Sequence, residues 1–363
     1  MTYDWRFLVS KGGLLVLKLA ARASVCVLIL ITGCARPGLH RNKQTSAAEA
    51  APEKLALDAV QDEKFKCASG KNVTAEFREL FHAPTEKLTE ERLARLRQHK
   101  VLLVHGLLGE VGLGVRGVLD KFDADQSVLS YLKDQEKVLD QYGIPYERII
   151  FRPHAVDRSG RKIADAILKQ DSPVIVFSHS KGCVDTLDAL LKLHAENKVD
   201  RVAGWISVQG PFLGSPQAER YVRHGGLRTF GIVAMRVMGG DFDAIRDLTP
   251  AARERYMAEQ RESIREIARH VPVLCFTSWD NRKDSLETPD APMAAEPEQL
   301  TSAFRIQPES CVLPGCDFIA KSGVTHNDPV IQGPQPYDRV AFTKAIFAML
   351  ADRMGRASKP PNR

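Results

Sequence analysis

The segment P-V-I-V-F-S-H-S-K-G-C-V-D, from Pro173 to Asp185, decides the fold of this chain. It starts with a short apolar run rich in β-branched residues, which predicts a buried strand. The run ends at Ser178, and a helix-like pattern begins directly after Gly182. Ser180 lies at the apex of the turn between them, where a side chain needs small neighbours two residues before and after it. Ser178 and Gly182 meet this requirement, so we predict a strand, a tight turn and a helix.

This S-x-S-x-G pattern is close to G-x-S-x-G, in which a strand-to-helix turn presents a catalytic serine. A single short motif also has a purely structural explanation, namely a buried strand that continues into a helix capped by a serine. The rest of the chain has to decide between these two interpretations.

The composition indicates a globular protein. The chain has 363 residues, and 44% of them are hydrophobic, which is enough for a substantial core in one large domain or two small ones. The formal net charge of +6 is small for this length. The sequence contains no block of Lys and Arg with interleaved aromatic residues, so we do not expect nucleic acid as a partner.

The N-terminus has the pattern of an export signal. Basic residues precede the apolar run Ala23 to Ile31, which is too short to cross a bilayer comfortably but suits the core of a signal peptide. The run ends in L-I-T-G-C, which resembles the lipobox of bacterial lipoproteins. This resemblance implies that residues 1–33 are removed and that Cys34 carries lipid and anchors the protein in the bacterial cell envelope. Ala35 is not the aspartate that retains many lipoproteins in the inner membrane, so the outer membrane is expected. A plain signal peptide is the alternative.

The remaining chain divides into a tether, one domain and a tail. Residues 34–64 are polar and rich in alanine, which predicts a flexible tether. We expect the folded domain over residues 65–356, with a short charged helix near Thr89–Leu96, and a frayed tail over residues 357–363.

A second buried strand, Val101–Val104, is followed by His105 and Gly106. Uninterrupted apolar strands are typical of parallel sheets covered on both faces. The glycine lets the backbone turn away closely and leaves N–H groups above the strand end. Acyl transfer needs two such donors for the oxyanion beside the nucleophile, and we predict the amides of Leu107 and Lys181 for this role.

Strands and helices alternate through the middle of the chain. We predict helices over Ser127–Tyr142, Gly160–Lys169 and Gly182–His194, and strands over Tyr146–Phe151 and Val202–Val208. This order is the signal for βαβ units and a mostly parallel sheet with helices on both faces.

Three motifs in register make the chain similar to an α/β-hydrolase of the bacterial lipase and esterase group. They are V-H-G-L-L-G at 104–109, S-H-S-K-G at 178–182 and G-P-F-L-G-S-P at 210–216. The resemblance extends from about Val101 to the C-terminal helix and implies the α/β-hydrolase fold with Ser180 as nucleophile. It also implies that the helical segment at about 217–270 is a cap or lid, with glycine pairs at 225–226 and 239–240 as hinges. A helix packed in the core is the alternative.

The general base is expected at His326, just after the last predicted strand, Asp317–Lys321. His179 is the other candidate, but a side chain beside Ser180 on the same turn cannot easily face the serine hydroxyl. No other histidine follows the last strand.

The acid of the triad is expected at the end of the strand Val271–Trp279, where a carboxylate can reach the histidine after the final strand. Asp280 stands directly at this end and is the first choice, with Asp284 and Glu298 in reserve. The segment before Leu313 lacks the aspartate that related lipases carry there. Either the acid has moved, or the triad is incomplete.

We predict no metal and no cofactor. Asp328 resembles a calcium-ligand position of some bacterial lipases, but one carboxylate does not make a metal site. Among the seven cysteines, Cys311 and Cys316 are close enough in sequence to pair, with Cys67 left over or as a competing partner. The spacing leaves the connectivity open.

These motifs predict a membrane-tethered serine hydrolase of the lipase or carboxylesterase class that acts on lipid-like esters. Two alternatives remain. A non-catalytic relative would bind a lipid or a protein partner through the same pocket, and an acyltransferase would use an alcohol in place of water. The sequence leaves the substrate and the oligomeric state open.

Overall fold

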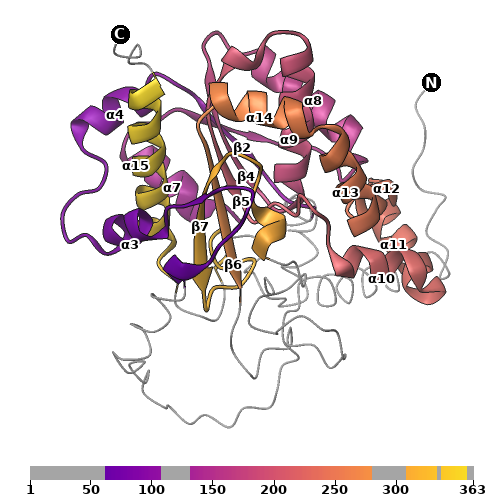
Figure 1. Cartoon of the computed structure of the whole chain (residues 1–363). Coiled ribbons are helices and arrows are strands. Elements are labelled where there is room, and N and C mark those ends of the chain that lie inside the picture. Colours follow the sequence, from indigo (N-terminus) through magenta and orange to yellow (C-terminus); the bar gives the residue numbers. More distant parts are fainter. Residues whose placement is uncertain (1–61, 108–130, 280–307, 333–336, 358–363) are drawn as a thin grey trace, which may run out of the picture.

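The computed structural model describes residues 62–107, 131–279, 308–332 and 337–357. In these residues a seven-stranded parallel sheet has the order β1-β7-β6-β5-β4-β2-β3, with helices on both faces (Figure 1). The predicted α/β architecture is therefore confirmed. The predicted signal peptide, Cys34, the tether up to residue 61 and all three candidate acids lie outside the described residues.

Four buried strands form the centre of the sheet: β2 (Val101–Val104), β4 (Val174–His179), β5 (Val202–Val208) and β6 (Val273–Trp279). Almost every residue of these strands is buried, because helices cover both faces of the sheet. At one edge lie β7 (Asp317–Ser322) and the short β1 (Lys71–Asn72), and at the other lies β3 (Tyr146–Ile149). β3 and β6 are each two residues shorter than predicted; β6 starts only after Pro272, which has no N–H for the ladder.

One face of the sheet is covered by α8 (Val156–Leu168), α9 (Lys181–Ala195) and α14 (Arg261–His270), whose apolar side chains join one core cluster. Helix α8 begins at Val156 and not at Gly160, as the sequence pattern predicted. The reason is a distant cap, because the carboxylate of Asp247 accepts the Val156 N–H at 2.8 Å.

The opposite face is covered by α3 (Thr74–His82), α4 (Glu90–Leu96), α7 (Lys133–Gln141) and α15 (Arg339–Ala357), which form a second core cluster. The short charged helix is confirmed as α4, and the side chain of Thr89 caps it. The predicted helix over Ser127–Tyr142 is α7, which begins only at Lys133 because Leu132 before it has a positive φ of 60°. Residues 127–130 of that prediction lie outside the described ranges.

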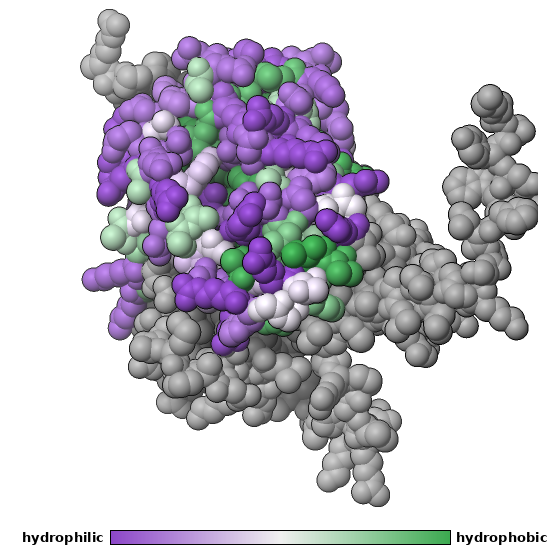
Figure 2. Space-filling view, turned by 90° about the vertical axis from the view of Figure 1, so that its right-hand side faces the viewer, coloured by the Kyte–Doolittle hydropathy of each residue, from purple (hydrophilic) through white to green (hydrophobic). Residues whose placement is uncertain are grey.

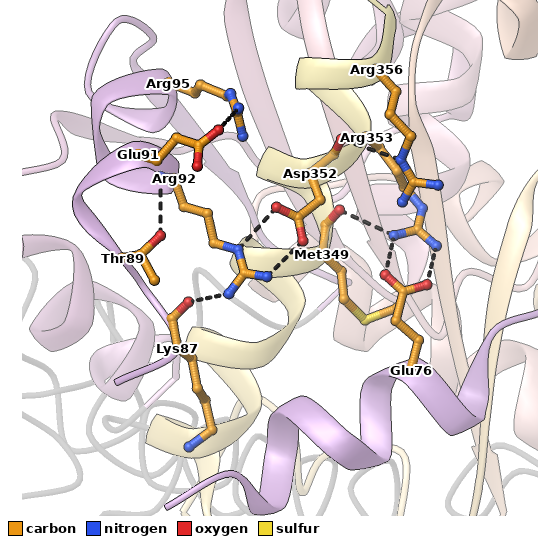
Figure 3. Close-up of polar contacts among 10 residues, drawn as sticks. All are labelled: Glu76, Lys87, Thr89, Glu91, Arg92, Arg95, Met349, Asp352, Arg353 and Arg356. Atoms are coloured by element: carbon orange, nitrogen blue, oxygen red, sulfur yellow. Dashed lines mark hydrogen bonds and ion pairs between the residues drawn. The ribbon is translucent and has the colours of Figure 1, made fainter. Parts of the chain in front are cut away.

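Arginine side chains connect α15 to the helices packed against it (Figure 3). Arg92 of α4 makes two hydrogen bonds to Asp352, at 2.9 and 2.7 Å. Arg353 makes two to Glu76 of α3, at 2.9 and 3.0 Å, and one to Asp317 at 2.8 Å. Bidentate pairs of this kind set the geometry of contact as well as adding stability.

The folded domain extends beyond both of its predicted ends. The side chain of Asp62 is buried, and its carboxylate accepts the Ser322 N–H at 2.8 Å and contacts Lys321 Nζ at 3.0 Å. Residues 62–64, expected in the tether, thus belong to the folded part. At the other end α15 continues to Ala357, which was expected in the tail.

Residues 217–270 are helical as predicted, in α10 (Pro216–Arg223), α11 (Gly225–Val237), α12 (Asp243–Arg246), α13 (Pro250–Glu259) and α14. Helices α10 to α13 form a group beside the sheet (Figure 1). In helix α11 Met235 is fully buried, whereas Leu227 and Val233 are exposed.

The spacing left the connectivity of Cys67, Cys311 and Cys316 open, and none of the five cysteines in the described ranges forms a disulfide. The thiol of Cys316 instead contacts that of Cys275. Cys311 and Cys316 are close in sequence but do not pair, since Cys311 ends the short 3-10 helix Pro308–Cys311 and Cys316 directly precedes β7.

Another short 3-10 helix in the described residues is Val199–Arg201. Within the described ranges, no helix combines the length and apolar character that crossing a membrane requires.

Candidate active site

Ser180 lies at the junction of β4 and α9, on the predicted turn. Its backbone has φ 56° and ψ −130°, a region that residues other than glycine rarely adopt. Such a conformation costs on the order of 1–3 kcal/mol and persists only where the surroundings enforce it. Two hydrogen bonds do so here: the Ser180 N–H donates to Val208 O at 2.9 Å, and the Ser180 carbonyl accepts from Cys183 N at 2.9 Å.

The three sequence motifs meet at this turn. A Cβ on Gly106 would lie 2.9 Å from Cβ of Ser180, and a Cβ on Gly182 would lie 2.4 Å from the His105 carbonyl oxygen. Both contacts are closer than any real side chain tolerates, so glycine is required at both positions. Gly210 of the third motif lies equally close to Cys183, one turn after Ser180.

The loop after β2 is oriented by His105. The amide of Phe151 can only donate, so Nε2 of His105, 3.4 Å away, accepts from it. Nδ1 then carries the proton and donates to the Gly106 carbonyl at 2.7 Å. Burial lowers the pKa of His105 to about 4, which keeps the ring neutral at pH 7. Because a trans peptide bond places N–H opposite C=O, this contact also sets the direction of the Leu107 N–H, the expected oxyanion donor.

The second expected donor, the amide of Lys181, lies in the first turn of α9, where amides have no acceptor within the helix. The Lys181 side chain is buried, with Nζ 2.6 and 2.8 Å from the two carboxylate oxygens of Asp185. Burial raises the pKa of the Asp185 carboxyl, and the charge of Lys181 opposes that rise. The ion pair holds the side chain of Lys181, the residue directly after the nucleophile, against Asp185 one turn further along α9.

A buried arginine on α13 extends this group of charges. Nε of Arg253 donates to the Phe212 carbonyl at 3.3 Å, and its guanidinium lies 4.3 Å from the ring centre of Tyr256. Tyr256 in turn donates to Asp188 of α9 at 2.8 Å. These contacts connect α13 to the nucleophile helix and to the loop of the third motif.

His326 follows β7 and is fully buried. Its carbonyl accepts a hydrogen bond from Nε2 of His179 at 3.0 Å, and the two ring centres are 4.8 Å apart. The neighbouring Thr325 carbonyl accepts from the Gln209 side chain at 3.2 Å. The structure therefore brings the loop of His326 to the turn that carries Ser180. Burial, and secondarily the charge of His179, lowers the pKa of His326.

Both ring nitrogens of His179 are engaged away from Ser180. Nδ1 lies 2.8 Å from Tyr131 Oη, while Nε2 contacts the His326 carbonyl. The ring is buried, and burial lowers its pKa to about 4. This gives a geometric reason for preferring His326 as the base.

The strand end that was expected to precede the acid pairs with the strand that leads to His326. Trp279, the last residue of β6, pairs with Ser322, the last residue of β7, and Asp280 is the next residue after Trp279. Asp280, Asp284 and Glu298 themselves lie outside the described residues.

Asp328 has a structural contact within the loop of His326. Its carboxylate accepts the Thr325 N–H at 2.7 Å. No cluster of three or more His, Cys, Asp or Glu residues suited to a metal ion occurs in the part of the chain that the structure describes.

Three residues of this region were not anticipated from the sequence: Tyr131, Gln209 and Arg253. Gln209 directly follows β5 and precedes the motif glycine, and its φ of 56° marks it as a second strained position. Arg253 and Tyr131 carry no local signal, because their partners lie on other elements.

Comparisons with known proteins agree with this architecture. The family model for lecithin:cholesterol acyltransferase matches residues 160–269, a segment that contains Ser180 but not His326. No curated protein matches the chain. The structure is similar to that of a metagenomic carboxyl esterase, with a TM-score of 0.58 and 18% identity over 78% of this chain and 93% of the other.

Two lipases also match. The mature Bacillus licheniformis lipase has a TM-score of 0.42 and 15% identity over 63% of this chain and 85% of the lipase. The Staphylococcus hyicus lipase has a TM-score of 0.46 and 10% identity over 72% of this chain and 97% of the lipase. The sheet topology together with the similarity to the esterase shows that the chain has the α/β-hydrolase fold, as predicted.

Proposed function

We propose that this protein is a serine hydrolase that cleaves carboxylic esters of lipid-like substrates, with Ser180 as its nucleophile. The backbone conformation of Ser180 carries the proposal. A serine held at a positive φ between a buried strand and a helix, with glycines packed against it, is what a presented nucleophile requires. The acyltransferase family match over this segment and the esterase with the same fold support the same reaction class.

In the proposed reaction, Oγ of Ser180 attacks the ester carbonyl carbon while His326 takes the hydroxyl proton. The amides of Leu107 and Lys181 hold the developing oxyanion, and His326 returns the proton to the departing alcohol. Water then attacks the acyl-enzyme and releases the acid. The lowered pKa of His326 keeps its imidazole neutral at pH 7, which is the form that can accept a proton.

Asp280 is the proposed orienting acid, and Asp284 and Glu298 are its alternatives. A carboxylate beside the imidazole selects its tautomer and stabilises its cation. The pairing of Trp279 with Ser322 supports Asp280, because Asp280 directly follows Trp279 in the sequence and His326 follows soon after Ser322.

The surface of α10 and α11 supports a substrate at a lipid surface. Apolar residues gather among hydrophilic ones on the face of the molecule that includes these helices (Figure 2). On α11, Leu227 is 40% and Val233 is 51% exposed, and Arg228 and Arg236 are exposed on the same helix. No acidic residue occurs in residues 220–240. Apolar side chains flanked by arginines favour the boundary between anionic headgroups and acyl chains.

A fluorophosphonate probe tests the nucleophile. We expect covalent labelling at Ser180, identified by peptide mass spectrometry, and loss of both labelling and ester hydrolysis in Ser180→Ala. A panel of esters of increasing acyl length then defines the substrate class. A folded wild-type protein that is neither labelled nor active would support the non-catalytic alternative.

Acyl transfer to an alcohol is the second candidate, because the matching family model is that of an acyltransferase. It uses the same nucleophile and differs only in the acceptor. Products formed with and without added long-chain alcohols distinguish the two, since a transferase makes a new ester where a hydrolase releases free acid.

We also propose that lipid on Cys34 anchors the protein in the outer membrane of a bacterial cell envelope. The L-I-T-G-C pattern supports this assignment. Metabolic labelling with a fatty acid is expected to mark the wild type and not Cys34→Ser, and fractionation of the envelope locates the labelled protein.

A further inference from the structure

The side chains of Tyr131 and His179 form a hydrogen-bonded bridge inside the protein. Tyr131 Oη lies 2.8 Å from the Gly106 amide nitrogen and 2.8 Å from Nδ1 of His179. On the other side of the imidazole ring, Nε2 lies 3.0 Å from the carbonyl oxygen of His326. Tyr131 is 6%, His179 2% and His326 0% exposed, so bulk water does not compete for these bonds.

A single arrangement of protons satisfies the bridge. The His326 carbonyl can only accept, so Nε2 of the neutral His179 ring carries the proton and donates to it, which leaves Nδ1 as an acceptor. The Tyr131 O–H therefore donates to Nδ1, while the Tyr131 oxygen accepts from the Gly106 amide. The lowered pKa of His179 keeps the ring in this neutral form at pH 7.

The bridge joins three segments that the proposed reaction needs in one place. Gly106 directly precedes the oxyanion donor Leu107, and His179 directly precedes Ser180. His179 and His326 are 147 positions apart in the chain. Both ends of the bridge are main-chain groups, so it acts on the position of the backbone and does not touch the reacting atoms.

We propose that Tyr131 and His179 are positioning residues that hold two loops in place beside Ser180. One is the oxyanion loop, which follows β2 and carries Gly106 and Leu107, and the other is the loop after β7 that carries His326. This inference rests on the proposed function. A displacement of about 1 Å between reacting groups costs on the order of a hundredfold in rate, so a bond that fixes these loops controls turnover more than substrate binding.

The test uses Tyr131→Phe, His179→Phe and the double variant in the full chain, with a soluble short-chain ester. Both substitutions keep an aromatic ring and remove the bridging atoms. We expect kcat to fall by about 10- to 100-fold, with KM changed by less than about twofold. Labelling of Ser180 by the fluorophosphonate should slow in parallel. The double variant should be no slower than His179→Phe, because both changes break the same bridge.

Tyr146→Phe and His99→Phe are the matched controls. Tyr146 contacts Asp140 at 3.3 Å at the exposed edge, and His99 contacts the Pro173 carbonyl at 2.8 Å, at the far end of β4 from Ser180. Both controls should keep the wild-type kcat, and melting temperatures measured for all variants separate folding from turnover.

The outcomes distinguish the inference from the function it rests on. The bridge is overturned if both single variants keep the wild-type kcat, or if the losses in kcat of the two single variants multiply in the double variant. In either case the proposed function still stands if Ser180→Ala abolishes hydrolysis. A folded wild type without hydrolysis, or a fully active Ser180→Ala, would instead overturn the proposed function and the bridge together.

Discussion

Gly106 lies directly against Ser180, so that a methyl group at residue 106 would come within 2.9 Å of the serine Cβ. We therefore expect Gly106→Ala to move the oxyanion loop or the nucleophile and to lower kcat/KM by on the order of a hundredfold. Gly226→Ala is the control, since a Cβ there meets nothing within 4 Å. Steady-state kinetics on a soluble ester compares kcat/KM of the two variants, and melting curves show whether both are folded. Equal kinetics for the two alanine variants would contradict the contact.

The buried pair of Lys181 and Asp185 predicts a large effect on stability. Asp185→Asn leaves the ammonium group of Lys181 buried without its counter-ion, which costs about 3–5 kcal/mol in the free energy of unfolding. Adding Lys181→Met to this variant removes the stranded charge, so the double variant should regain part of the loss. Urea denaturation of the wild type, both single variants and the double variant measures the interaction free energy between Lys181 and Asp185. A double variant no more stable than Asp185→Asn argues against the pair as the cause.

The orienting acid is identified by isosteric substitution. Asp280→Asn is expected to lower kcat by roughly 10⁴-fold, because the imidazole then loses the partner that selects its tautomer. Asp284→Asn and Glu298→Gln serve as controls and should stay near the wild type. If one of them shows the large loss instead, that residue is the acid. Full activity in all three variants would mean that the triad has no acid among these positions.

Buried neutral histidines predict sensitivity to acid. The pKa values of His105 and His179 are lowered from 6.5 to about 4 by burial, so protons bind the unfolded chain more readily than the folded one. Their contribution to stability is complete above pH 6.5 and is lost as the pH falls from 6.5 to about 4. The loss is on the order of 3 kcal/mol for each ring. Urea denaturation from pH 7 to pH 4.5 measures it, and a flat stability profile over this range would contradict the assignment.

The exposed apolar and basic residues of α11 predict a preference for anionic lipid surfaces. Leu227→Asp combined with Arg228→Glu is expected to lower hydrolysis of an ester embedded in phosphatidylglycerol vesicles by about tenfold or more, since each basic residue contributes about 1 kcal/mol there. Hydrolysis of a soluble ester should not change. Phosphatidylcholine vesicles provide the uncharged comparison. An equal loss on the soluble ester would assign the effect to folding and not to the surface.

Much of the fold could be predicted because its signals are local. The uninterrupted apolar runs that became β2, β4 and β5 are buried on both faces, and this burial is what such runs require. The turn at Ser180 was also local, since small neighbours two residues to either side make it sterically possible.

Several differences from these predictions came from contacts between distant segments. Helix α8 starts early because Asp247 caps it, and residues 62–64 are folded because Asp62 binds the end of β7. The spacing of the cysteines left their connectivity open, and in the structure Cys316 contacts Cys275 on a neighbouring element. No pattern within a short stretch of sequence contains this information.

By itself, the sequence determined the strand-turn-helix at Ser180, the order of the three motifs and the parallel sheet, because periodicity and small residues act within a few positions. Only the tertiary structure decided how the site is held together. The bridge from Gly106 through Tyr131 and His179 to His326 depends on hydrogen bonds between segments far apart in the chain. Such bonds have no local signature, since each partner is ordinary in its own stretch and acquires its role only when the sheet brings the strand ends together.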